Sequence, residues 1–320
     1  MEHTPLVSVV IPVYNCGRTI ARAIESALQQ QYQALDVVVV DDGSTDGTRE
    51  AVARFAPQVR LVAQPNRGAA AARNRGISES RGRFVAFLDA DDEWLPGRIE
   101  KGVAPMLDDP PVGATFCRLH RVYPDGDRDI YGEAYKKCRT FPEYLWPSSY
   151  VQTSGATCRR SALERVGPLD ESLQSHDELD LWIRIGESFR IVEIAEPLAM
   201  FHDTPGSYSK RWDGARSEDD YYRVIDRALT RCPDRYAPHR GVIMADAHLH
   251  WGILYLVRGN HRRARLFLRR SLAIKPTVTA AALLAGACLP HRAVKAVLQA
   301  VKQMRNRAAE RGRAAEGARP

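Results

Sequence analysis

The stretch LVSVVIPVYN at residues 6–15 decides the fold, because its apolar, β-branched run is typical of a strand buried on both faces. A second such run, LDVVVV at 35–40, ends at the turn-forming residues DDGSTDGT, 41–48. Shorter strands are predicted at 59–63 and 84–88. Helices are predicted between these strands, at 19–31, 48–55 and 69–78. This alternation predicts an α/β fold, with a mostly parallel, Rossmann-like sheet flanked by helices.

Ligands of such sheets bind beyond the carboxyl ends of the strands, and an acidic cluster follows the strand at 84–88 directly. Asp89, Asp91 and Asp92 repel one another unless a cation lies among them. Alternate residues of an extended chain point the same way, so Asp89 and Asp91 could share one Mg²⁺ or Mn²⁺ that also binds a diphosphate. The alternative is a solvated acidic turn in which Asp92 caps the next helix.

Polar residues also follow the neighbouring strands. Asp42 could accept hydrogen bonds from a base or a ribose, and its alternative role is in a turn and helix cap. Arg73 could pair with phosphate in forked geometry, or it could be a solvated surface arginine.

Two later features could carry chemistry. The segment HDELDLWIR, 176–184, places carboxylates in the first turn of a predicted helix, where one could act as a general base toward a hydroxyl. The alternative is plain capping, and Trp182 and Arg184 are interpreted as packing and ion-pair residues. His202 precedes a Pro-Gly-Ser loop and could contact a phosphate or a metal, although a lone histidine is more often structural.

Four segments of the chain form a distinctive combination: VSVVIPVYN (7–15), VVVVDDGSTDGT (37–48), NRGAAAARNRG (66–76) and FLDADDEWLPGR (87–98). Together they resemble glycosyltransferase family 2, whose members have the GT-A fold. The resemblance extends over about residues 5–210 and implies a nucleotide-sugar donor, an Mn²⁺ or Mg²⁺ cofactor and a glycan or lipid-linked acceptor. UDP is implied as the nucleotide by the resemblance alone.

The resemblance also implies roles for individual residues. It assigns nucleotide-sugar contacts to Pro12, Tyr14, Asn15, Asp42, Arg73 and Asp89. It assigns metal contacts to Asp91, Asp89 and His202, of which Asp91 is the most direct ligand. The family's Glu-Asp pair is exchanged here, so Glu178 aligns with the catalytic base and Asp177 is the alternative. The family's Tyr-Arg-x-His motif reads Ala199-Met200-Phe201-His202, which keeps the histidine only.

The predicted reaction is an inverting sugar transfer in cell-surface polysaccharide synthesis. The alternative is a catalytically weak nucleotide-sugar-binding protein that acts as a scaffold through its helical tail, and the exchanged acids at 177–178 are the feature that favours it. A sugar nucleotidyltransferase would need a glycine-rich basic loop after the first strand, where this chain has Pro12-Val13-Tyr14-Asn15. No Ser-His-Asp arrangement or P-loop pattern is visible, which disfavours hydrolases and ATPases.

The charge of the 320 residues is unevenly distributed. The net charge is +7, yet residues 258–320 hold 15 Lys and Arg against two Asp and Glu, and the first 257 residues hold 31 against 37. The chain beyond about 215 is predicted to be helical, and Gly252, Tyr255, Ala264, Leu268 and Pro276 have the spacing of one tetratricopeptide-like hairpin. The alternative for these helices is a two-helix cap on the catalytic body. The predicted domains are therefore a catalytic domain, 1–210, a helical extension, 211–300, and a basic tail expected to be disordered, 301–320.

The basic end predicts contact with an anionic surface. Residues 277–301 form an Ala/Leu/Val-rich segment, interrupted at Pro290 and followed by Lys302, Arg305, Arg307, Arg311 and Arg313, a pattern that suits an anionic membrane. Nucleic acid is not expected, because no aromatic residue interleaves the basic run. No apolar run of eighteen residues or basic leader is present, and six scattered cysteines indicate free thiols. We expect a cytoplasmic chain, peripheral on the inner face of the membrane.

Overall fold

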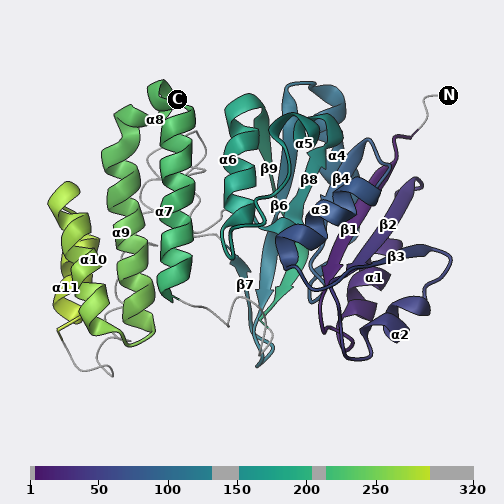
Figure 1. The fold of residues 1–320 in the computed structure, drawn as a ribbon, viewed down its shortest axis with the longest axis horizontal. Coiled ribbons are helices and arrows are strands. Elements are labelled where there is room, and N and C mark those ends of the chain that lie inside the picture. The colour runs from purple at the N-terminus through teal and green to yellow at the C-terminus, as the bar shows by residue number, and fades with distance from the viewer. Residues whose placement is uncertain (1–3, 132–150, 204–213, 289–320) are drawn as a thin grey trace, which may run out of the picture. The chain divides into compact units, whose positions relative to one another are not determined.

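A computed structural model of the chain describes residues 4–131, 151–203 and 214–288 (Figure 1). The described residues form two compact units. The first contains residues 4–131, 151–203 and 214–224, and the second contains residues 225–288. The predicted basic tail, 301–320, and the interrupted segment beyond residue 288 lie outside the described residues.

The predicted alternation of strands and helices is confirmed in the first unit. Its N-terminal elements are β1 (Val7–Val13), α1 (Ile20–Leu28), β2 (Leu35–Asp41), α2 (Thr48–Ala53), β3 (Val59–Ala63), α3 (Ala69–Glu79) and β4 (Phe84–Phe87). The four strands pair in parallel in the order β3-β2-β1-β4. The polar residues that follow each of these strands therefore lie along the same edge of the sheet.

Beyond β4 the sheet becomes mixed rather than parallel. The remaining elements are β5 (Glu93–Trp94), α4 (Arg98–Asp108), β6 (Val112–Val122), β7 (Arg128–Tyr131), the 3-10 helix η3 (Thr153–Gly155), β8 (Ala156–Arg159), α5 (Arg160–Val166), α6 (Asp177–Ser188) and β9 (Arg190–His202). The sheet continues from β4 in the order β8-β6-β9-β5, and β7 pairs with β6. The β4–β8, β8–β6, β6–β7 and β9–β5 pairs are antiparallel, whereas β6 and β9 are parallel.

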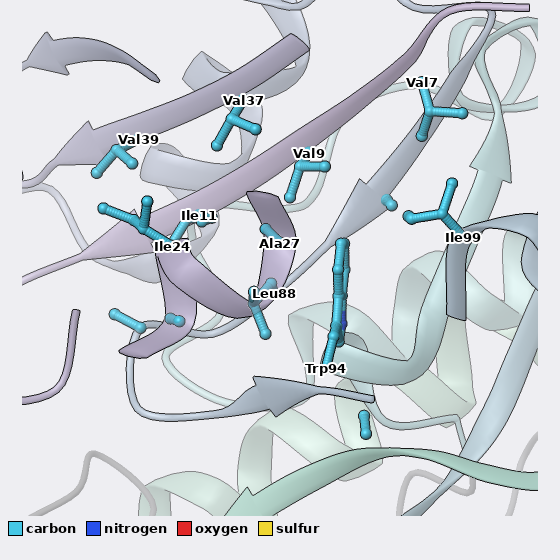
Figure 2. Close-up of a cluster of buried hydrophobic side chains, with 14 of the residues drawn as sticks. Val7, Val9, Ile11, Ile24, Ala27, Val37, Val39, Leu88, Trp94 and Ile99 are labelled. Carbon is cyan, nitrogen blue, oxygen red and sulfur yellow. The ribbon is translucent and has the colours of Figure 1, made fainter. Parts of the chain in front are cut away.

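Both faces of the central strands β1, β2 and β4 are buried, as their continuous apolar runs predict. Val7, Val9 and Ile11 of β1 point into one cluster, which helices α1, α2 and α4 complete (Figure 2). Val10, between them, points into the cluster on the opposite face, which contains Trp182 of α6. Because successive strand residues face opposite sides, a strand covered on both sides has no polar side.

The second unit is helical, as predicted. Its elements are the C-terminal part of α7 (Gly214–Arg231), from Ile225 on, then α8 (Pro233–Tyr236), the 3-10 helix η5 (Ala237–His239), α9 (Arg240–Val257), α10 (His261–Ile274) and α11 (Val278–Gly286). The predicted hairpin is formed by α9 and α10. A Cβ at Gly252 would lie 2.7 Å from Cγ of Leu268, and the rings of Tyr255 and Phe267 stack with centroids 5.7 Å apart.

The described residues bear on the predictions about membrane spans and cysteines. Among the described helices, none has a long enough apolar stretch to cross a bilayer. Five of the six cysteines, Cys16, Cys117, Cys158, Cys232 and Cys288, are free thiols, and Cys138 lies outside the described residues.

Candidate active site

The first part of the site lies where β1 and β2 end. Asn15 has a left-handed backbone (φ 53°), its N–H donates to Ser44 Oγ at 2.9 Å, and its Oδ1 accepts from the Thr45 N–H at 2.8 Å. Tyr14 beside it is 41% exposed, so its ring is available to a ligand. The structure therefore brings the predicted nucleotide contacts Pro12, Tyr14 and Asn15 together with the loop that follows β2.

Asp42 has a structural role that the sequence did not predict. Its Oδ1 accepts from Gln64 Nε2 at 2.8 Å and from the Arg67 N–H at 2.9 Å, and its Oδ2 accepts from the Gly68 N–H at 2.8 Å. The side chain is buried. Asp42 therefore holds the β3–α3 loop in place, and a hydrogen bond to a base or ribose would use its remaining acceptor capacity.

Arg73 of α3 connects two acidic groups that lie far apart in the sequence. Its Nη2 donates to Asp89 Oδ1 at 2.9 Å, and its Nη1 donates to Asp177 Oδ2 at 3.3 Å. Burial by itself would lower the pKa of Arg73, but the negative charges of Asp89, Asp177 and Glu178 outweigh burial and raise this pKa above its usual range. Arg73 is thus a buried cation between the Asp-x-Asp segment and the start of α6, rather than a solvated arginine.

The Asp-x-Asp segment lies directly after β4 and concentrates negative charge. Burial, followed by the charge of Asp89, raises the pKa of Asp91 to about 6. Burial and the two neighbouring aspartates raise the pKa of Asp92 well above its usual value. Asp92 is buried rather than solvated, and it accepts hydrogen bonds from the Ser154 hydroxyl and, at 3.3 Å, from the His202 N–H.

Two residues that sequence reasoning missed support this segment. The Asp89 N–H donates to Ser154 Oγ at 3.1 Å, so Ser154 joins Asp89 and Asp92 through one hydroxyl. Nη2 of Arg22 in α1 donates to the carbonyl oxygen of Asp91 at 2.6 Å. Ser154 belongs to η3, in a region of the chain with no readable pattern.

The second acidic pair begins α6. Asp177 is 7% exposed, and its pKa is raised by burial and by Glu178, which together outweigh the lowering effect of Arg73. Glu178, the next residue, is only partly buried. As interpreted from the sequence, Arg184 is an ion-pair residue, with Nε 2.7 Å from Asp180 Oδ2, and Trp182 packs edge-on against Phe87.

His202, at the end of β9, lies beside an acidic side chain of β5. Its Nε2 lies 3.4 Å from Glu93 Oε2, and its pKa is lowered by burial and by Arg22. Within the described ranges, no three His, Cys, Asp or Glu side chains gather as a ligand set for a metal. A metal role for His202 stays a prediction.

Comparison with known proteins agrees with this arrangement. The family model described as "Glycosyl transferase family 2" matches residues 8–167, which is half of the chain. The chain belongs to glycosyltransferase family 2. This family 2 glycosyltransferase is 28% identical, over 235 residues, to the putative teichuronic acid biosynthesis glycosyltransferase TuaG of Bacillus subtilis, covering 70% of this chain and 89% of TuaG.

Other relatives share a smaller part of their length. The uncharacterized glycosyltransferase YibD of Escherichia coli is 43% identical over 112 residues, which is 34% of this chain and 33% of YibD. The hyaluronan synthase of Pasteurella multocida is 36% identical over 129 residues, which is 39% of this chain but 13% of the synthase. This family 2 glycosyltransferase therefore spans a third or less of these two proteins.

Solved structures confirm the GT-A fold. The mannosyltransferase PcManGT from Pyrobaculum calidifontis, in complex with GDP-Man and Mn²⁺, has a TM-score of 0.63 at 25% identity, covering 95% of this chain and 88% of its own. Residues 1–349 of Staphylococcus aureus TarS have a TM-score of 0.62 at 18% identity, covering 96% and 92%, which shows the fold alone.

The residues of this family 2 glycosyltransferase fit a divalent cation. Burial and then the charge of Asp89 raise the pKa of Asp91, and a cation between the two carboxylates would offset their mutual repulsion. Carboxylate oxygens suit Mg²⁺ and Mn²⁺. Asp89 and Asp91 would supply two ligands, because Arg73 occupies Oδ1 of Asp89 only. Ligands that the protein does not supply would be phosphate oxygens or water.

Proposed function

We propose that this chain transfers a sugar, with inversion, from a nucleotide-sugar donor to a hydroxyl of a glycan or lipid-linked acceptor in cell-surface polysaccharide synthesis. The observation that carries the proposal is the position of Arg73, which bonds both Asp89 of the Asp-x-Asp segment and Asp177 beside Glu178. Arg73 thereby holds the acids proposed for the donor close to the acids proposed for the acceptor, as a direct displacement between two bound substrates requires.

Glu178 is proposed as the general base. Asp177 is buried and bonded to Arg73, whereas Glu178 is partly exposed on the first turn of α6. Glu178 would take the proton of the acceptor hydroxyl as that oxygen bonds to the anomeric carbon, and the bond to the nucleoside diphosphate breaks. A positioned base contributes roughly 10²–10⁴-fold to such a step. A divalent cation at Asp89 and Asp91 would offset charge on the departing diphosphate.

A donor panel tests this proposal. The purified chain is incubated with Mn²⁺ or Mg²⁺ and UDP-sugars, with GDP-mannose as a further donor, and release of nucleoside diphosphate is measured beside Asp91→Ala. Metal-dependent release from one donor, lost in Asp91→Ala, is expected. Absence of release from every donor, together with absence of donor binding in calorimetry, would overturn the transferase proposal and favour the scaffold alternative.

We also propose that α10 contacts the anionic inner face of a membrane. Arg262, Leu266 and Arg269 are exposed along one side of the helix, and Leu266 is 46% exposed. Ile274, at the end of the same helix, is 44% exposed. No Asp or Glu occurs from Ala247 to Ala309. Basic and apolar groups that alternate on one exposed surface suit lipid headgroups, and such a contact would bring the chain near a lipid-linked acceptor.

Vesicle sedimentation tests the membrane contact. Each basic residue near an anionic surface contributes roughly 1 kcal/mol, so the double variant Arg262→Glu/Arg269→Glu should weaken binding to phosphatidylglycerol-containing vesicles by about 30-fold or more. Arg54→Glu/Arg81→Glu has the same charge change on exposed arginines of the first unit and should bind normally. Equal binding of both double variants would contradict the proposal.

A further inference from the structure

The residues that immediately precede the two acids of α6 are held by helix α7. The N–H groups of Gln174 and Ser175 both donate to Oδ2 of Asp220, at 2.9 and 3.2 Å. One turn earlier on α7, Ser217 Oγ lies 3.2 Å from Ser175 Oγ and 3.2 Å from Nε2 of His176. All of these residues belong to the first compact unit.

The contact surface on α7 is buried. Asp220 is 2% exposed, and its other oxygen, Oδ1, lies 3.5 Å from Nη1 of Arg223. The fully buried ring of Tyr221 meets the ring of His176 edge-on, with centroids 5.5 Å apart. Hydrogen bonds from backbone N–H groups to a carboxylate are stronger than those between neutral groups, so the two bonds to Asp220 hold the segment 174–176 in place.

The backbone conformation of His176, directly before α6, needs support from neighbouring residues. His176 has a left-handed backbone (φ 64°), and its carbonyl oxygen accepts the Asp180 N–H at 3.0 Å, which starts α6. A residue other than glycine keeps such a conformation only where its surroundings hold it. The orientation of Asp177 and Glu178 at the start of α6 therefore depends on the hydrogen bonds that hold residues 174–176 in place.

The other end of the same loop is fixed from α3. Asn74 Oδ1 accepts the Leu169 N–H at 2.9 Å, and Asn74 Nδ2 donates to the Leu169 carbonyl oxygen at 2.9 Å. Asn74 follows Arg73, which bonds Asp177. The start of α6 is thus held at one side by α3 and at the other by Asp220 of α7.

We propose that Asp220 is a positioning residue for sugar transfer, which orients Asp177 and Glu178 by fixing the backbone of Gln174 and Ser175. The inference rests on the proposed function, because it requires the acids of α6 to act on an acceptor. It predicts an effect on the transfer step rather than on donor affinity. The proposed donor contacts Asn15 and Asp42 follow β1 and β2, and hydrogen bonds to the loops at 43–48 and 64–68 hold them.

Variants of α7 test the inference. Asp220→Ala removes the acceptor of both backbone N–H groups, and kcat should fall by about 10–100-fold, because small displacements of catalytic groups carry costs of that size. The donor Kd from calorimetry and the donor KM should change by less than about twofold. Asp220→Asn keeps an acceptor oxygen and should restore kcat to within about fivefold of wild type. Asp219→Ala, at the adjacent exposed position, is the matched control and should leave kcat unchanged.

The outcomes separate this inference from the proposed function. With UDP-sugars, GDP-mannose and Mn²⁺ as probes, a wild-type chain that neither binds a donor nor releases nucleoside diphosphate would overturn the proposed function and this inference together. An active wild type with equal kcat in Asp220→Ala and Asp219→Ala would overturn the positioning role alone. An equal loss of donor affinity and kcat would do the same.

A second variant keeps the inference testable if Asp220→Ala does not fold. Ser217→Ala keeps the buried carboxylate and removes the hydroxyl beside Ser175 and His176. Its kcat should fall by about 3–10-fold at unchanged donor Kd, and backbone amide exchange at residues 174–176 should accelerate. Wild-type kcat and wild-type exchange in Ser217→Ala would overturn the inference.

Discussion

Replacing Arg73 by methionine removes the cation that joins the two acidic groups. The Arg73 side chain is 10% exposed, and its partners Asp177 and Asp89 are 9% and 33% exposed. Removing one partner of a buried ion pair costs about 3–5 kcal/mol, because the remaining charge is left in a poorly solvated place. Since Asp89 is partly solvated, we expect the lower end, about 3 kcal/mol of the free energy of unfolding at pH 7.5.

Urea unfolding of the variant, followed by circular dichroism, measures this loss. Arg75→Met is the matched control, because Arg75 lies on the same helix, is 51% exposed and pairs with Glu79 only four residues away. Such surface pairs contribute about 0.3–0.5 kcal/mol, so the control should remain close to wild type. Turnover of Arg73→Met should fall by at least about 10²-fold, since the acids on both sides lose their shared donor.

The pH dependence of the same experiment checks the cause. Without Arg73, the pKa of Asp177 loses its main lowering influence and rises further, because burial and Glu178 still raise it. The unfolded state binds fewer protons at that site, so the deficit of Arg73→Met should shrink as the pH falls toward 5. A deficit that is independent of pH, or one matched by Arg75→Met, would refute the reasoning.

Three further outcomes follow from local geometry. Burial lowers the pKa of His176 to about 4, so the free energy of unfolding of the wild type should decrease as the pH falls from 6.5 to 4, by at most about 3 kcal/mol. Urea titrations should show a smaller decrease in His176→Asn. Gly252→Ala should lower the free energy of unfolding by about 1–3 kcal/mol, because the added methyl group overpacks the contact between α9 and α10. Gly241→Ala, on the same helix, should not lose stability, and thermal unfolding of the two variants checks the difference. Ser154→Ala should lower kcat by about 10-fold and weaken Mn²⁺ binding in calorimetry.

The first four strands were predictable because each is predominantly apolar, although β2 contains Asp36 and β3 contains Arg60. Val7–Val13 and Leu35–Asp41 are covered on both faces, and turn-forming residues follow both of them. The antiparallel strands β8 and β6 were not predictable in the same way. They belong to the region with many prolines and turns, and β8 is only four residues long, so its periodicity carries little information.

The positions of candidate site residues were predictable where these residues follow a strand. Asp89 and Asp91 follow β4, and Tyr14 and Asp42 follow β1 and β2, so parallel pairing places them along one edge of the sheet. What joins these groups is contact between segments far apart in the sequence. Arg73 meets Asp177 across 104 positions, and such pairs leave no local pattern.

The residues that support the candidate site could not be predicted from the sequence for the same reason. Ser154, Arg22 and Asp220 are ordinary polar residues in their own segments, and each becomes informative only through a hydrogen bond to a distant backbone or carboxyl group. Asp42 shows the converse, because a residue chosen for ligand contact also accepts three hydrogen bonds from its own chain.

The proposed base provides the most direct test of the central claim, metal-dependent sugar transfer by the acids at the sheet edge and at α6. The measurement is the rate of nucleoside diphosphate release from the preferred donor by wild type and by Glu178→Gln, with the donor Kd determined for both. We predict a rate about 10²–10⁴-fold lower in the variant, at an unchanged Kd. A Glu178→Gln chain that releases nucleoside diphosphate at the wild-type rate would contradict the account.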